Sequence, residues 1–136
     1  MKIILIGAIV GIVSVIGLIA CGRVPTPKLI IGGLYSIDEG KGGYRIAKIL
    51  ALDDKGTHIR FYKNSFATRP DQINPATLEI GTIHDTDGFG MGHLPLLKDN
   101  FQSWNPIFIK QTTIEKEELE GYEMWKEAGG GYFGSE

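Results

Sequence analysis

Cysteine is almost absent from this sequence, because Cys21 is the only one among 136 residues. A single cysteine excludes an intramolecular disulfide and every zinc site built from several cysteines. Charged side chains are missing from residues 3–20, where only glycines and Ser14 interrupt an aliphatic run. The one cysteine therefore follows directly on the one long hydrophobic stretch of the chain.

An excess of positive charge is also lacking. The formal net charge is -2, from 14 basic and 16 acidic residues, and Lys2 is the only charged residue before Cys21. A mildly acidic domain has no electrostatic footprint for nucleic acid. It also lacks the basic cluster beside a membrane that binds anionic lipids. We therefore expect no nucleic-acid partner.

Signatures of catalysis are missing as well. No serine stands in a Gly-x-Ser-x-Gly context, and the glycines form neither a P-loop nor a dinucleotide fingerprint. The carboxylate pairs Asp38/Glu39 and Asp53/Asp54 fall in predicted turns, where solvation leaves them ordinary acids. We therefore expect a protein that is not an enzyme and needs no cofactor.

The first residues have the order of a secretory signal: a positive start at Lys2, an apolar core and small residues. The segment Leu18-Ile19-Ala20-Cys21 resembles the lipobox of bacterial lipoproteins. The resemblance implies that residues 1–20 are a signal peptide and that the mature chain starts at Cys21, acylated on its sulfur and its amine. Several acyl chains anchor a protein stably, whereas one is marginal. The resemblance therefore implies that the partner of this protein is the membrane and that the protein is located at the cell membrane.

Two alternatives to a lipid anchor stay open. The apolar run of residues 3–20 reaches the lower end of the length that spans a bilayer, so it could be an uncleaved transmembrane helix. Basic residues on its two sides are nearly balanced, so the positive-inside rule does not decide between a lipid anchor and a transmembrane helix. A plain signal peptide cut elsewhere is the second alternative. All three interpretations direct the chain to a membrane.

Residues 21–28 form a linker that Pro25 and Pro27 stiffen, and residues 29–136 form one small globular domain. Strands are predicted over residues 29–37, 44–52 and 57–63, joined by turns at 38–43 and 53–56. An irregular segment over residues 64–75 precedes a further predicted strand at 78–83. A glycine-rich loop over residues 84–93 and a last strand at 107–110 follow it. The pattern predicts an antiparallel meander.

Two helices complete the prediction, a short one over residues 97–104 and a final one that follows Thr112. Thr112-x-x-Glu115 fits a capping box. Leu119, Tyr122 and Trp125 recur every three residues as an inward stripe, and glycines 129–131 end the helix. The expected fold class is α+β: a small curled antiparallel sheet with a C-terminal helix, preceded by an N-terminal apolar helix.

The strand order resembles small SH3-like or Tudor-like barrels, as does the stretch from Gly33-Leu34-Tyr35 to Phe61-Tyr62. The segments Gly90-x-Gly92-His93-Leu94-Pro95 and Glu118-Leu119-Glu120-Gly121-Tyr122-x-x-Trp125 are similar to an uncharacterised family of bacterial proteins. No activity is known for that family, so the resemblance implies no mechanism.

The loop of residues 84–93 holds the best candidate metal ligands: His84, Asp85, Asp87 and His93. Asp85-x-Asp87-Gly88 resembles part of a calcium loop, but the glutamate required at position twelve is replaced by Leu96. The alternative is a solvated turn in which aspartates cap backbone amides.

A second candidate is a recognition patch of His58, Arg60 and Tyr62 on the polar face of the third strand. The alternative is an ordinary solvent face with cross-strand pairs. Five aromatic residues either fill the core or line a groove for a peptide: Trp104, Phe108, Trp125, Tyr132 and Phe133. The last two follow the glycines, so they either fold back onto the sheet or await a partner.

These observations together predict a membrane-anchored lipoprotein with a non-enzymatic role, which binds another protein or a component of the cell envelope. The alternative function is a metal- or ligand-binding module that uses the loop of residues 84–93.

Overall fold

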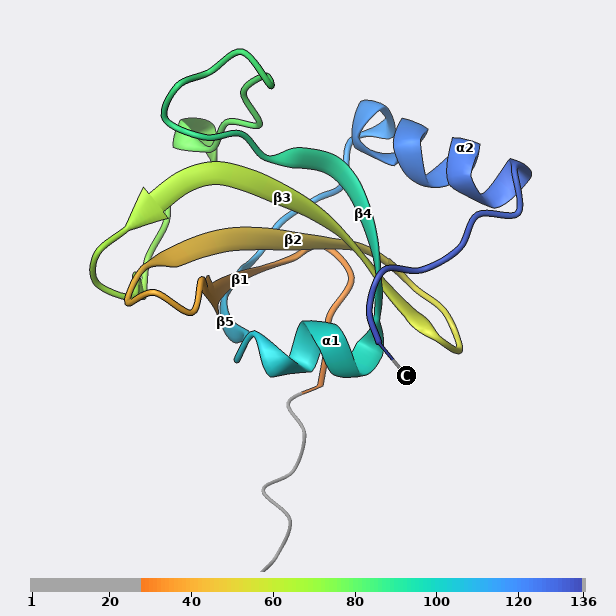
Figure 1. Ribbon diagram of the computed structural model, residues 1–136, viewed down its shortest axis with the longest axis horizontal. Helices are drawn as coiled ribbons and strands as arrows, with labels where there is room; N and C mark the ends of the chain where they lie inside the picture. Colours follow the sequence, from red (N-terminus) through yellow and green to blue (C-terminus); the bar gives the residue numbers. More distant parts are fainter. Residues whose placement is uncertain (1–27, 136) are drawn as a thin grey trace, which may run out of the picture.

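The computed structural model describes residues 28–135, which form an α+β domain built on a five-stranded antiparallel sheet (Figure 1). The strands are β1 (Gly33–Asp38), β2 (Tyr44–Leu52), β3 (Gly56–Phe66), β4 (Met91–Leu97) and β5 (Ile107–Gln111). The helices are α1 (Lys98–Ser103) and α2 (Glu120–Glu127), with single 3-10 turns η1 (Pro75–Thr77) and η2 (Lys116–Leu119). The predicted apolar helix and Cys21 lie outside the described residues, among which no helix is long and apolar enough to cross a membrane.

The predicted meander is confirmed, since β1, β2 and β3 are neighbours in the sheet order β4-β3-β2-β1-β5. Glycines with positive φ, Gly40 and Gly42, allow the turn between β1 and β2. In the next turn the Asp53 carboxylate accepts hydrogen bonds from the backbone N–H groups of Lys55 (2.9 Å) and Gly56 (2.6 Å). Local turn chemistry therefore sets this part of the fold.

β4 and β5 lie on opposite edges of the sheet, and α1 crosses one face to connect them (Figure 1). Phe101 of α1 is fully buried there, and its ring meets that of Tyr35 edge to face at 6.2 Å. The core on this face comprises Tyr35, Ile37, Ala47, Ile49, Ile59, Leu94, Leu96 and Phe101. The predicted short helix thus closes the main hydrophobic core.

The other face of the sheet is covered as well. The loop between β3 and β4 packs Ile73, Leu78 and Ile80 against Leu34 and Ile46. On the same face, η2 and α2 cover β4 and the adjoining part of β3. Every residue of β2 from Ile46 to Leu50 is therefore buried, in agreement with a strand buried on both faces.

The prediction of a strand at residues 78–83 is wrong. The backbone of these residues makes one backbone–backbone hydrogen bond to β3, from Lys63 N to Glu79 O at 2.8 Å, and forms no ladder. The edge of β3 is instead occupied by β4, in which Met91 stands opposite Phe61. The predicted loop of residues 84–93 accordingly ends inside a strand, because pairing with β3 extends over its last residues.

The last helical segment begins later than predicted. Glu115, not Thr112, caps η2, and its side chain and that of Glu118 form the capping box. The Thr112 hydroxyl instead donates to the Gly32 carbonyl at 2.7 Å, which fixes the chain beside β1. The inward stripe is confirmed, because Leu119, Tyr122 and Trp125 are partly buried while most of α2 is exposed.

The C-terminal segment folds back along the outer edge of β4. Leu97 N donates to Phe133 O at 2.9 Å, and Phe133 N donates to Pro95 O at 2.8 Å. The side chain of Tyr132 packs inward, whereas Phe133 stays 60% exposed. Of the two alternatives for these residues, the structure shows the fold-back onto the sheet, through the backbone of Phe133 and the side chain of Tyr132.

Candidate functional site

Three hydrogen-bonded side chains, Asp53, His58 and His93, form a polar cluster in the described domain. His58 Nε2 lies 2.6 Å from Asp53 Oδ2, and His58 Nδ1 lies 2.9 Å from His93 Nε2. The β2–β3 turn supplies Asp53, β3 supplies His58 and β4 supplies His93. His58 is fully buried in the middle. We call this group the histidine chain.

The protonation states of Asp53 and His93 follow from the electrostatics of the histidine chain. Burial opposes the charged form of Asp53, but hydrogen bonds from His58, Tyr132 and two backbone amides hold its pKa well below the usual range. Burial, with a smaller contribution from His58, lowers the pKa of His93 to about 4. The ionised carboxylate only accepts, so His58 Nε2 carries a hydrogen, and one hydrogen is shared between His58 Nδ1 and His93 Nε2.

Aromatic rings of α2 and of the C-terminal segment enclose His58. The ring centroids of Tyr122 and Trp125 lie 4.8 Å and 4.5 Å from that of His58. The Tyr132 hydroxyl donates to Asp53 Oδ2 at 2.6 Å, and this bond raises the pKa of Tyr132 to about 12. Both ring nitrogens of His58 are used inside the histidine chain, which leaves no lone pair for a metal or substrate. The arrangement fastens the C-terminal segment to the sheet.

The predicted recognition residues lie under η2 and α2 rather than on an open face. His58 is fully buried and Tyr62 is 7% exposed. Arg60 is partly buried, with its Nε 3.8 Å from Glu118 Oε1. The three residues do share one side of β3, as predicted, but the expectation that this side is open to solvent is wrong.

A buried ion pair that the sequence did not reveal holds the same cover in place. Lys48 of β2 is 4% exposed, and its Nζ lies 2.8 Å from Glu118 Oε2 and 2.6 Å from the carbonyl of Thr113. Burial opposes the charged form of Glu118, but the Lys48 hydrogen bond and further contacts hold its pKa below the usual value. No local signal predicts this pair, because its two members are far apart in the sequence.

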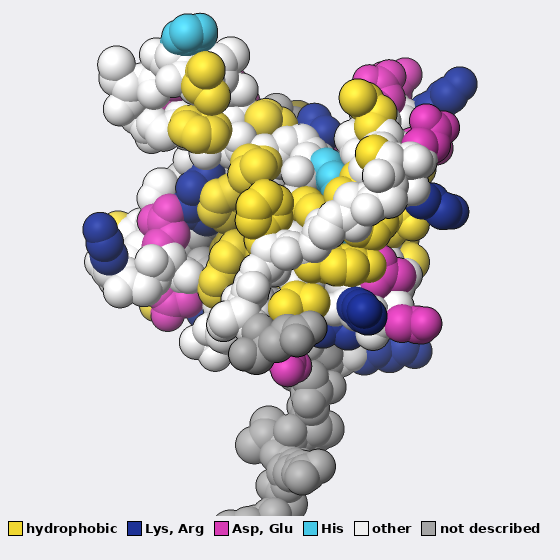
Figure 2. All heavy atoms as spheres, turned by 45° about the vertical axis from the view of Figure 1, so that its right-hand side comes forward, with side chains coloured by type: hydrophobic (Ala, Val, Ile, Leu, Met, Phe, Trp, Pro, Cys, Tyr) yellow, Lys and Arg dark blue, Asp and Glu magenta, His cyan; other side chains and the backbone are white. Residues whose placement is uncertain are grey.

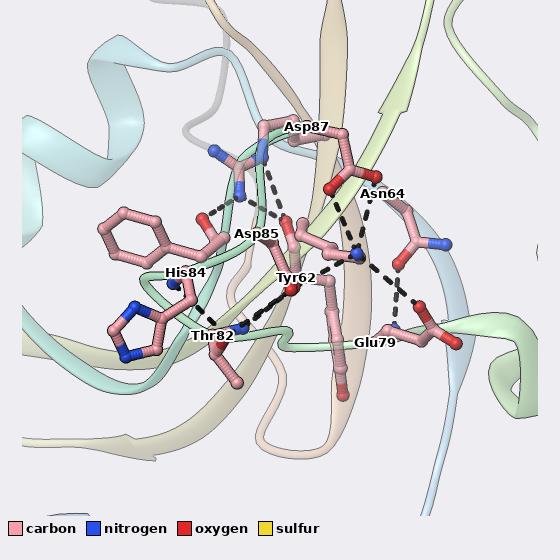
Figure 3. A network of polar contacts seen from close by, with 10 residues as sticks. Tyr62, Asn64, Glu79, Thr82, His84, Asp85 and Asp87 are labelled. Atoms are coloured by element: carbon pink, nitrogen blue, oxygen red, sulfur yellow. Dashed lines mark hydrogen bonds and ion pairs between the residues drawn. The ribbon is translucent and has the colours of Figure 1, made fainter.

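The acidic loop residues surround a lysine (Figure 3). Lys63 Nζ lies 3.3 Å from Asp85 Oδ2 and 3.3 Å from Asp87 Oδ1, with Glu79 Oε2 at 3.9 Å. The Thr82 N–H donates to Asp85 Oδ2 at 2.9 Å; this bond, followed by Lys63, lowers the pKa of Asp85. The ammonium of Lys63 therefore supplies the positive charge that a metal ion would bring to these carboxylates.

The four predicted metal ligands are divided between two places. Asp85 and Asp87 pair with Lys63, the His84 ring lies apart from both carboxylates in Figure 3, and His93 belongs to the histidine chain. Within residues 28–135, no group of three or more His, Cys, Asp and Glu side chains is arranged to hold a metal ion. Asp85 accepts hydrogen bonds from the backbone and hydroxyl of Thr82, which is the turn alternative predicted for this loop.

Another cluster is formed around the Arg45 side chain. Its guanidinium carbon lies 3.7 Å from the centre of the Phe61 ring. Arg45 donates to the carbonyl of Tyr62 from Nε (2.9 Å) and Nη2 (2.7 Å), and from Nη2 to that of Phe89 (2.9 Å). Glu39 Oε1 lies 3.5 Å from Nε. Arg45 thus joins β2 and β3 to the residues that precede β4.

Apolar side chains stand exposed around this arginine. Phe89 is 45% and Met91 39% exposed, and Phe61 lies 6.1 Å from Trp104 between ring centroids. A pocket of about 280 Å³ opens here, lined by Ile37, Asp38, Glu39, Arg45, Phe61 and Trp104. Figure 2 shows hydrophobic side chains gathered over the middle of one face. We call Phe61, Phe89, Met91 and Trp104, with Arg45, the Arg45 patch.

The aromatic residues that the sequence left open are divided between core and surface. Trp125 packs on His58, and Tyr132 bonds to Asp53, so both are structural. Trp104 lines the pocket of the Arg45 patch, and Phe108 of β5 is 45% exposed. Sequence reasoning missed Arg45 and Phe61 because the alternation along a strand does not show which part of a sheet face stays uncovered.

Comparisons of this chain with protein-family models, with curated proteins and with solved structures found no match.

Proposed function

We propose that the chain is a membrane-anchored lipoprotein whose domain binds another protein of the cell envelope, without catalysis, through the Arg45 patch. The observation that carries the proposal is an exposed apolar surface with a small pocket in it and charged residues on its rim. Exposed apolar patches rimmed by polar residues are typical of interaction sites. The aromatic centre and polar border match the usual anatomy of a protein interface.

The size of the pocket favours a protein side chain over a free small molecule. Sites for small ligands usually enclose about 300 to 1,000 Å³ and bury most of the ligand. The pocket of the Arg45 patch has about 280 Å³ and is open to solvent. Such a pocket suits one aliphatic or aromatic anchor residue of a partner, with Arg45 and Glu39 on the rim.

The alternative of a metal-binding module has less support. Lys63 neutralises Asp85 and Asp87, so a cation would have to displace an ammonium that three carboxylates approach. Calorimetric titration of the full chain with calcium and with zinc tests this alternative. Heat of binding that disappears in the Asp85→Asn variant would support the metal site and count against the assignment of this loop as structural.

The lipid anchor and the SH3-like character of the sheet belong to the same proposal. The lipobox residues 18–21 support lipidation at Cys21, and the β1–β2–β3 meander supports the SH3-like comparison. Mass spectrometry of the chain produced in bacteria tests the anchor. We expect diacylated or triacylated protein starting at Cys21, and an unprocessed precursor for Cys21→Ser. Identical masses, apart from the substitution, would point to a transmembrane helix instead.

The partner proposal is tested with the full chain in its own membrane. Chemical cross-linking followed by purification should recover a protein in stoichiometric amount from the wild type. The double variant Phe89→Ser, Met91→Ser should lose it, because the anchor side chain of the partner then loses its apolar surroundings. Met124→Ser is the matched control, since Met124 is 70% exposed on α2, away from the patch. Equal recovery from all three chains would refute the assignment.

A further inference from the structure

A second group of exposed hydrophobic residues lies where the chain enters the described domain. Ile30 is 38%, Ile31 50% and Phe108 45% exposed. They are neighbours in space, because a Cβ atom on Gly33 would lie 2.9 Å from the Ile30 carbonyl oxygen and 3.3 Å from the Phe108 ring. The Gln111 side-chain amide also donates to the Ile31 carbonyl at 2.8 Å. We call Ile30, Ile31 and Phe108 the entry face.

Contacts with the core hold the entry face in an exposed position. The Phe108 ring packs edge to face on Tyr35, with centroids 5.6 Å apart. The Ile30 N–H donates to the Tyr35 hydroxyl at 2.8 Å. Tyr35 is itself fully buried, and burial raises its pKa despite the hydrogen bond from Ile30. The three apolar side chains are therefore part of a fixed surface, for which a second, external partner is expected.

The position of the entry face relative to the anchor identifies that partner. In Figure 1 the chain joins the domain on the side where α1 and β5 lie. Residues 21–27 connect Cys21 to the first described residue, Lys28, and can span at most about 25 Å. We propose that the entry face rests on the lipid bilayer in which the chain is anchored. This inference depends on the proposed membrane anchor.

The tether makes a small contact sufficient. A short linker converts docking into an intramolecular step with a high effective concentration, so a few apolar side chains can bind a surface that they would not hold alone. Aromatic and aliphatic side chains enter the boundary between headgroups and acyl chains, about 5 to 10 Å deep. β5 is an edge strand, and its outer backbone groups require water or headgroup partners. The contact is therefore interfacial and does not reach the hydrocarbon centre.

The experiment uses the full chain, purified from bacterial membranes and reconstituted into phosphatidylcholine vesicles. The variants Ile31→Cys and Phe108→Cys carry an environment-sensitive fluorophore on the new cysteine, and Met124→Cys on the outer face of α2 is the matched control. The wild-type chain gives the background from labelling at Cys21. We expect a blue-shifted emission at positions 31 and 108, and several-fold stronger quenching by lipids with a nitroxide on the upper acyl chain than at position 124.

The outcomes separate this inference from the anchor itself. Sedimentation of the vesicles shows whether the chain is anchored; a chain left in the supernatant overturns the anchor and the docking with it. A chain that sediments, with equal quenching at all three positions, overturns the docking alone. Because Phe108 packs on Tyr35, Phe108→Cys can lose stability, and position 31, which is half exposed, then decides the result.

Discussion

The histidine chain predicts that acid destabilises the domain through His93. The pKa of His93 is lowered from an ordinary 6.5 to about 4, first by burial and then by His58. A group whose folded-state pKa lies below its unfolded value binds protons more readily in the unfolded state. Its favourable contribution is therefore complete above about pH 6.5, and it is lost as the pH falls toward the folded-state value.

The magnitude follows from these two values. Between about pH 7 and pH 5, linkage for one histidine with a pKa of 6.5 unfolded and about 4 folded gives about 2 kcal/mol. Because the His93 ring is partly exposed, solvent screening reduces this, and we expect about 1 to 2 kcal/mol. The carboxylates with lowered pKa, Asp53, Asp85 and Glu118, lose their contributions mainly at lower pH.

Urea unfolding of the full chain in detergent, followed by tryptophan fluorescence at several pH values between these limits, measures the effect. Trp125 packs at 6.0 Å from His93 between ring centroids, so its emission reports on the same region. His93→Gln removes the titrating ring and should remove most of the slope. His84→Gln replaces an exposed histidine and should keep it. Equal slopes in the wild type and both variants would refute the reasoning.

Three further predictions concern the cover formed by η2, α2 and the C-terminal segment. Tyr132→Phe removes the hydrogen bond to Asp53 and should lower the free energy of unfolding by about 1 to 2 kcal/mol in urea titrations, with much less effect in an Asp53→Asn background. Lys48→Met leaves the partly buried Glu118 with only the weaker ion pair to Arg60, at 3.8 Å, and should cost about 2 to 4 kcal/mol; adding Glu118→Gln should recover part of this loss, and no recovery would exclude the ion pair as its cause. Gly121→Ala should lower the melting temperature despite a gain of about 1 kcal/mol in helix propensity, because the new Cβ would lie 2.8 Å from His93 Cβ; Gly131→Ala, where a Cβ meets nothing within 4 Å, is the control.

Local chemistry made part of the fold predictable. The residues from Tyr44 to Leu52 form the strand that was predicted, since a run of Ile, Leu and Ala between two turns can be satisfied only by burial on both sides. The Asp53 turn and the stripe of Leu119, Tyr122 and Trp125 are equally local. These features depend on neighbours within a few residues, so the sequence alone specifies them.

The features that sequence reasoning missed are set by contacts between distant segments. Residues 78–83 have the composition of a strand, but the edge of β3 has room for one partner, and β4 takes it with Pro95 in the middle. The alternation along the third strand predicts that His58 faces solvent, because the helix that covers it, α2, lies more than 60 residues further along the chain. Proximity in sequence places His93 with His84 and the aspartates, although pairing of β4 with β3 brings it to His58 instead.

The outer backbone groups of the two edge strands differ in what covers them. This difference connects the C-terminal segment with the proposed docking on the bilayer. An edge strand exposes unpaired backbone groups that invite association with other chains. The C-terminal segment covers β4 through the hydrogen bonds of Phe133, and the histidine chain fastens that segment through Tyr132. Among residues 28–135, no strand pairs with the outer edge of β5, the strand that carries Phe108. If the entry face rests on the bilayer, the headgroup region shields this remaining edge, so detaching the domain from its membrane should expose β5 and promote self-association. Light scattering of the full chain in vesicles and of a chain released by proteolysis within residues 21–27 compares the two states; a released domain that stays monomeric at high concentration would show that β5 needs no such shield.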